Sequence, residues 1–186
     1  MARRHLDFYE TNAFAVRALR RRVNIQGQVF EPCNGLGAIS SQFQDCVVST
    51  NDIDQTKPAM FHFDAKGFDY KMFQIDGLPN DNTPIWVVTN PPFNEAFDIV
   101  RRSVEAGCPS CYLLRLSWVE PTRSSEEKGG RGQWLSKHPP EAMIVLPRYS
   151  FTGDGKTDSV TCAWFCWNLP AGVLKGPAIQ VAPADE

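Results

Sequence analysis

The stretch VTNPPFNEAF, Val88 to Phe97, joins two kinds of secondary structure and decides the fold. It continues the apolar, β-branched run Ile85–Thr89, which is typical of a strand covered on both faces. Proline cannot donate a hydrogen bond to a sheet ladder, so this strand must end at Asn90. Asn94–Ala106 then has the spacing of a helix, with an inward face of Ala96, Phe97, Val100 and Val104. A buried strand that leads directly into a helix predicts an α/β fold.

Strands and helices alternate along the rest of the chain. The helix Asn12–Val23 comes first, with Asn12 as its cap and an apolar stripe along one side. The predicted strands are Gln28–Glu31, Cys46–Asp52, Ala59–Phe63, Ile85–Thr89, Cys111–Ser117, Ala142–Leu146 and Val160–Trp167. A Gly-rich stretch without helical pattern precedes the last of them, which predicts that this strand runs antiparallel. We therefore expect a single domain, residues 1–186, with a Rossmann-like, doubly wound, mostly parallel sheet and an irregular tail from Pro170.

The composition is that of a globular protein. Hydrophobic residues make up 42% of the 186, which excludes a disordered chain. No apolar run is long enough to cross a bilayer, and the N-terminus lacks the apolar segment of a secretory signal. We therefore expect no membrane association and a cytoplasmic location in a bacterial or phage-infected cell. The six cysteines are expected to be reduced thiols without a metal, although Cys108 and Cys111 have CxxC spacing.

Charge is distributed unevenly, although the formal net charge is only −2. Residues 1–22 hold six arginines against two acids, whereas residues 45–82 hold seven acids against three lysines. The balanced total is not that of a typical nucleic-acid-binding domain. This separation of basic and acidic residues fits a cationic ligand near the acidic stretch and an anionic ligand elsewhere. The alternative is that both stretches are ordinary solvated surface.

Two features after the early strands predict a nucleoside pocket. EPCNGLG, Glu31–Gly37, follows the first strand and opens a helix, and its glycines allow the backbone to pass close to a ligand; a tight strand-to-helix turn is the alternative. Asp52 stands at the tip of the second strand, where a carboxylate accepts both hydroxyls of a ribose. Asp64 follows the third strand and can accept from an adenine amino group, or can simply cap its loop. The series describes a pocket for an adenosine that carries a charged substituent.

The Asn-Pro-Pro-Phe motif, Asn90–Phe93, adds a step beyond binding. The Asn90 side-chain oxygen and the Pro91 carbonyl oxygen can both accept hydrogen bonds, and the prolines hold them rigidly. Phe93 offers a flat face on which a base can stack. Together they suit a planar ring with an exocyclic amine, such as adenine. Two acceptors on the amine hydrogens make its nitrogen more pyramidal and more nucleophilic. As an alternative, Asn90 could cap the next helix and the prolines could start it. This would explain Asn90 or one proline, but not all four residues.

These features together resemble the class I S-adenosylmethionine-dependent methyltransferases, in the branch that modifies the N6 amine of adenine. EPCNGLG is similar to the cofactor loop of that family, NDID to the segment with its ribose-binding acid, and NPPF to its catalytic signature. Asp7–Thr11 resembles the upstream segment that touches the methionine part of the cofactor. The resemblance covers Asp7–Trp167 and implies a seven-stranded sheet with an antiparallel last strand.

The resemblance also implies which residues form the site. The catalytic residues would be Asn90, Pro91, Pro92 and Phe93. The residues that contact S-adenosylmethionine would be Tyr9, Thr11, Glu31, Pro32, Asn34, Gly35, Gly37, Asp52, Ile53, Asp64 and Asn90. The implied reaction is methylation of adenine in DNA. Enzymes of this branch usually carry a separate target-recognition domain, for which this chain has no room. It thus resembles small phage-encoded or orphan enzymes, and we expect either relaxed specificity or a homodimer or partner subunit that supplies specificity.

A basic surface for the DNA backbone is predicted beyond the motif. The polar, Gly-rich segment from Trp118 to His138 follows the strand after the motif, so it should start at the same end of the sheet. We expect a mobile loop there. The residues expected to contact phosphates are Arg123, Lys128, Arg131, Arg148 and Lys156. A plain solvated loop is the alternative, because Glu126 and Glu127 dilute the charge.

Other functions remain open from the sequence. The same chemistry could act on adenine in RNA or on the glutamine amide of release factors, whose methyltransferases have a similar Asn-Pro-Pro-Tyr. Cytosine N4 is disfavoured, because those enzymes commonly have serine in place of Asn90. A non-catalytic cofactor-binding subunit would have no need of the intact motif, and a nicotinamide-dependent oxidoreductase would give it no role.

Overall fold

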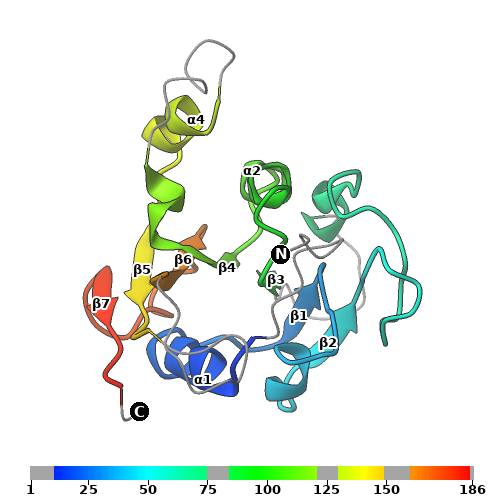
Figure 1. Ribbon diagram of the computed structural model, residues 1–186, viewed down its shortest axis with the longest axis horizontal. Helices are drawn as coiled ribbons and strands as arrows, with labels where there is room; N and C mark the ends of the chain where they lie inside the picture. The colour runs from blue at the N-terminus through cyan, green and yellow to red at the C-terminus, as the bar shows by residue number, and fades with distance from the viewer. Residues whose placement is uncertain (1–10, 75–83, 121–129, 149–159, 185–186) are drawn as a thin grey trace, which may run out of the picture.

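The computed structural model describes residues 11–74, 84–120, 130–148 and 160–184. These residues build one sheet of seven strands in the order β2-β1-β3-β4-β6-β5-β7 (Figure 1). The strands are β1 (Gln28–Glu31), β2 (Val47–Thr50), β3 (Ile85–Thr89), β4 (Ser110–Arg115), β5 (Ala142–Val145), β6 (Cys162–Trp167) and β7 (Ile179–Val181). The predicted Rossmann-like α/β class is confirmed.

One strand of the sheet runs against the others. β1 pairs in parallel with β2 and β3, and β3 with β4. β6 pairs antiparallel with both β4 and β5, as predicted for the strand at Val160–Trp167. The parallel strands therefore all end at the same edge of the sheet, which is where open α/β sheets bind ligands.

Helices cover both faces of the sheet. α1 (Ala13–Arg22) and α2 (Ala96–Glu105) lie on opposite sides in Figure 1. Asn12 caps α1 by accepting a hydrogen bond from the Phe14 N–H at 2.9 Å, as predicted. Alternate residues of β3 point to the two faces, so that Trp86 and Val88 join the core beneath α1 while Val87 joins the core beneath α2. No helix in these described ranges is long and apolar enough to cross a membrane.

Three predicted elements differ from the structure. Residues 59–63 form no strand, and only an isolated bridge joins Asn51 to Phe61. Phe61 is 47% exposed, so this segment lacks a second buried face that would hold it in a ladder. No α-helix follows EPCNGLG; a turn and the short 3₁₀ helix η1 (Ser40–Gln42) take its place. The tail predicted to be irregular contains β7, which satisfies the outer edge of β5 by parallel pairing.

The side chain of Asn51 replaces the missing ladder. Its Oδ1 accepts the Phe63 N–H at 2.9 Å, and its Nδ2 donates to the Phe63 carbonyl oxygen at 3.0 Å. The same Nδ2 donates to the carbonyl oxygen of Pro32 at 3.0 Å. The fully buried amide thus acts as a peptide group that ties the segments after β1 and β2 to the segment at Phe63.

Asn51→Ala should lower the free energy of unfolding by about 1–3 kcal/mol, because buried backbone groups of Pro32 and Phe63 lose their partner. The isosteric Asn51→Asp should cost at least as much, since its carboxylate would face two carbonyl oxygens. Urea unfolding measures both. Asn24→Ala, at an exposed position, is the control. Asn51 variants as stable as this control would contradict the role given to the amide.

Candidate functional site

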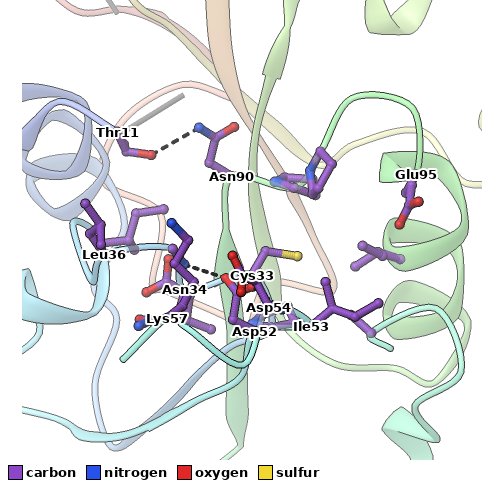
Figure 2. Close-up of a pocket in the computed structure, with 18 of the residues that line it drawn as sticks. Thr11, Cys33, Asn34, Leu36, Asp52, Ile53, Asp54, Lys57, Asn90 and Glu95 are labelled. Atoms are coloured by element: carbon purple, nitrogen blue, oxygen red, sulfur yellow. Dashed lines mark hydrogen bonds between the residues drawn. The ribbon is translucent and has the colours of Figure 1, made fainter. Parts of the chain in front are cut away.

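A cavity of about 350 Å³ lies at the carboxyl ends of β1, β2 and β3 (Figure 2). Nearly all predicted site residues in the described ranges line it: Thr11, Glu31, Pro32, Asn34, Gly35, Asp52, Ile53, Asp64, Asn90, Pro91, Pro92 and Phe93. Gly37 does not line it, and Tyr9 lies outside the described residues. The structure therefore brings the predicted nucleoside pocket and the Asn-Pro-Pro-Phe motif into one cavity.

The glycine loop turns sharply beneath the cavity. Gly35 and Gly37 have φ angles of 55° and 84°, in the left-handed region that favours glycine. A Cβ on Gly37 would lie 3.4 Å from the Ser40 hydroxyl oxygen. Gly35 therefore reaches the cavity as predicted, whereas Gly37 shapes the turn behind it.

Asp52 holds the glycine loop in place. Its Oδ2 accepts the Gly35 N–H at 2.7 Å, and its Oδ1 accepts the Asp54 N–H at 2.9 Å. A carboxylate has about four lone-pair sites, so both oxygens keep the capacity to accept a further hydrogen bond. The half-buried Asp52 carboxylate is thus rigid and still able to accept hydroxyl groups from a ligand.

Glu31 lies buried at the base of the same loop. Its Oε2 accepts the Ser40 N–H at 2.8 Å, and the Ser40 hydroxyl donates to Asn34 Oδ1 at 2.7 Å. Burial raises the pKa of the Glu31 carboxyl well above its ordinary value, an effect that the Ser40 hydrogen bond opposes and the charge of Asp52 reinforces. Burial, followed by the charges of Asp52 and Glu31, also raises the pKa of the neighbouring Cys33, which therefore remains a neutral thiol at neutral pH.

The cavity is strongly acidic. Among the described residues, five acidic side chains line it against one ammonium group, that of Lys57; they are Glu31, Asp52, Asp54, Asp64 and Glu95. In Figure 2, Asp52 and Asp54 lie on one side of the cavity and Glu95 on the other. A cation between them would gain attraction from several directions, as the charge distribution of the sequence predicts.

Asn90 joins the motif to the start of α1. Its Nδ2 donates to the Thr11 hydroxyl oxygen at 3.1 Å, a contact that spans 79 positions of the chain. Figure 2 shows the Asn90 nitrogen directed toward Thr11 and the oxygen on the other side of the amide. Thr11 therefore fixes the orientation of the predicted catalytic amide.

Two contacts at the site involve residues that the sequence analysis missed, Arg115 and Lys66, neither of which lines the cavity itself. The Arg115 guanidinium stacks over the Phe93 ring, with Cζ 4.3 Å from the ring centroid. The Lys66 ammonium forms an ion pair with Glu95 at 3.2 Å and lies 3.9 Å from Asp64. The hydrogen bond and charge of Glu95 raise the pKa of Lys66. Position supplied the only signals: Glu95 stands two residues after the motif, and Arg115 ends the next strand.

The predicted basic surface is described only in part. Arg123, Lys128 and Lys156 lie outside the described residues. From Arg131 the expected loop is instead the helix α4 (Arg131–Lys137), because Trp134 is buried and donates to Glu105 Oε1 at 2.9 Å. Arg131 itself donates to the Glu120 carbonyl oxygen and stacks over Trp118. Arg148 is exposed.

All six cysteines are free thiols, as expected. Cys111 and Cys166 face each other in the ladder between β4 and β6. They, Cys108 and Cys162 are buried, whereas Cys33 and Cys46 are partly exposed.

Glu31→Gln should flatten the dependence of stability on pH. The folded-state pKa of Glu31 is raised, so the folded protein binds more protons between the unfolded and folded pKa values. The free energy of unfolding of the wild type therefore contains a contribution that is lost as pH rises through that window. Gln keeps an oxygen for the Ser40 N–H and has no proton to lose. Thermal unfolding from about pH 5 to about pH 8 tests this, with exposed Glu120→Gln as control; parallel curves for Glu31→Gln and wild type would contradict it.

No family model and no curated protein matches the chain. Solved structures do match it, at low sequence identity. A chain assigned as a modification subunit of a type I restriction enzyme from Vibrio vulnificus YJ016 is 12% identical, with a TM-score of 0.54, and the match covers 91% of this chain and 46% of that one. A chain from a study of complex assembly in the type I R-M system is 15% identical, with a TM-score of 0.53 and coverages of 94% and 45%. The protein thus spans about half the length of both chains and shares their fold.

Proposed function

We propose that the protein is an S-adenosylmethionine-dependent methyltransferase that acts on the N6 amine of adenine in DNA. The observation that carries this proposal is the single cavity in which an acidic nucleoside pocket meets Asn90–Phe93. A cofactor site and a base site must share one cavity if a methyl group is to pass between them. The modification subunit and the chain from the type I R-M system that share the fold fit the proposal.

The residues of the cavity suit this cofactor. S-adenosylmethionine would supply a methyl group bound to a positively charged sulfur, and acidic side chains outnumber ammonium groups among the described residues that line the cavity. Asp52 would accept the ribose hydroxyls, and Asp64 would accept from the adenine amino group. Ile53, 55% exposed at the cavity, would give the adenine ring an apolar contact.

The motif would hold the target amine. The Asn90 nitrogen donates to Thr11, and the Asn90 oxygen would accept a hydrogen from the amine. The Pro91 carbonyl oxygen would accept the other hydrogen, and Phe93 would support the ring. Hydrogen bonds to both hydrogens make the nitrogen lone pair more available. The described cavity residues include no histidine, and the mechanism needs no strong base.

Specificity would come from outside this domain. The chain spans 46% and 45% of the chains that share its fold, so a second copy or a partner subunit would read the target sequence. The same site could accept adenine in RNA or a glutamine amide. A direct test is to incubate the protein with tritiated S-adenosylmethionine and separate duplex DNA, single-stranded DNA, RNA and protein. Label in N6-methyladenine of DNA is the expected result, and label confined to RNA or protein would replace DNA as substrate.

Asp52→Ala should weaken S-adenosylmethionine binding by about 1.5–3 kcal/mol, because a charged acceptor for two hydroxyls is lost. The variant also releases the Gly35 N–H, which should loosen the loop that faces the cofactor. Isothermal titration calorimetry measures the change, and circular dichroism checks that the fold is retained. Asp98→Ala is the matched control, since Asp98 is exposed on α2 and does not line the cavity. Equal affinity for both variants would remove Asp52 from the cofactor site.

Asn90→Ala and Phe93→Ala should reduce methyl transfer at least 100-fold (about 2.7 kcal/mol), because the amine and the base lose their supports. Both variants should still bind S-adenosylhomocysteine with near wild-type affinity. Turnover with DNA and calorimetry with S-adenosylhomocysteine separate the two effects. Full activity of Asn90→Ala would refute the mechanism, and a wild type that binds cofactor but labels no acceptor would favour a non-catalytic cofactor-binding subunit.

A further inference from the structure

We propose that Arg115 is a substrate-contacting residue: its guanidinium, which lies over Phe93, would leave that ring for a phosphate beside the target nucleotide when the base binds. The inference rests on the proposed function, because it requires a nucleic acid as substrate. Its starting observation is the 4.3 Å separation of the Arg115 Cζ and the centre of the Phe93 ring.

The guanidinium occupies one face of the Phe93 ring, a face on which a base could stack. It is planar and delocalised, and it lies on aromatic faces by cation–π attraction. A base that stacks on this face of Phe93 needs the same layer, so the two groups cannot occupy it together. The guanidinium therefore covers one face of the ring and would have to leave it for a base to stack there.

Among the described residues, no carboxylate pairs with Arg115. No ion pair joins its side chain to any other residue in the described ranges, whereas Arg20 pairs with Asp45 and Arg101 with Asp98. Its side chain is exposed, and it is the one exposed residue of β4. A guanidinium released from Phe93 thus remains a solvent-exposed cation, which is suited to bidentate pairing with a phosphate.

The sheet places this cation beside the emerging backbone of the substrate. β4 is the neighbour of β3, which leads into Asn90, and both strands end at the same edge. On the far side of β4, Arg115 pairs with Cys162, whose carbonyl oxygen also accepts the Leu146 N–H. Leu146 therefore lies at the level of Arg115, two strand spacings or about 10 Å away. Exposed Arg148 follows it by two residues and extends the positive edge away from the cavity.

Arg115→Ala and Arg115→Lys test the proposal, with Arg102→Ala as the matched control. Arg102 is exposed in the last turn of α2, the end remote from the cavity. Two quantities are measured: KM and kcat for methyl transfer to unmethylated plasmid DNA, and the salt dependence of affinity for a random-sequence DNA duplex. Arg115→Ala should raise KM about tenfold, as expected for one charged hydrogen bond, and change kcat less. It should also reduce the slope of log affinity against log salt by about one unit.

The lysine variant separates charge from shape. It keeps the cation, so it should restore the salt slope, but it lacks the planar fork and should recover KM only in part. A purely structural role for Arg115 would leave the salt slope unchanged in every variant. Any of three results would overturn the inference: KM and salt slope unchanged in Arg115→Ala, a salt slope that Arg115→Lys does not restore, or an equally large change in Arg102→Ala. If the wild type is active, none of these results would affect its assignment as a methyltransferase. A wild type that methylates no DNA would overturn the proposed function, and this inference with it.

Discussion

The side-chain amide of Asn51 is the interaction on which the site depends. A strand at residues 59–63 would have fixed the third segment by a backbone ladder, but only one bridge forms there. The amide supplies the missing donor and acceptor to Phe63 and adds a bond to Pro32. Asp52 follows Asn51 and Asp64 follows Phe63, so one buried side chain positions both acids. The cavity wall is therefore built from three loops that a single hydrogen-bonding group holds together.

The electrostatics of the cavity favour an occupant. Carboxylates that lie close together repel one another, and burial of Glu31 adds a desolvation cost, which its raised pKa reflects. Backbone N–H groups of Gly35, Asp54 and Ser40 offset part of this cost, because they donate to the acids. The remainder would be offset by a cation in the cavity. Under the proposed function, this excess of negative charge would favour a cationic cofactor such as S-adenosylmethionine over a neutral or anionic nucleotide.

Local patterns in the sequence predict the fold better than they predict the complete site. β1 and β3 begin and end where predicted, because turn-forming residues bound each apolar run. β7 was missed because it is only three residues long and lies in a tail rich in proline and glycine. It forms a strand only because the edge of β5 is there to pair with it. The cavity residues were found through motifs that place glycine, acid and amide after successive strands. Arg115 and Lys66 were missed because their partners, Phe93 and Glu95, become neighbours only through the sheet and no local rule links them.

The contact between Thr11 and Asn90 has a consequence for the order in which the site is assembled. Under the proposed function, Thr11 belongs to the cofactor side and Asn90 to the target side, yet they share one hydrogen bond at 3.1 Å. A cofactor that contacts Thr11 would also influence the direction in which the Asn90 oxygen points. By thermodynamic linkage, a base bound to that oxygen would influence cofactor affinity to the same degree. Cofactor and base would therefore bind as coupled ligands, because one amide serves both halves of the cavity.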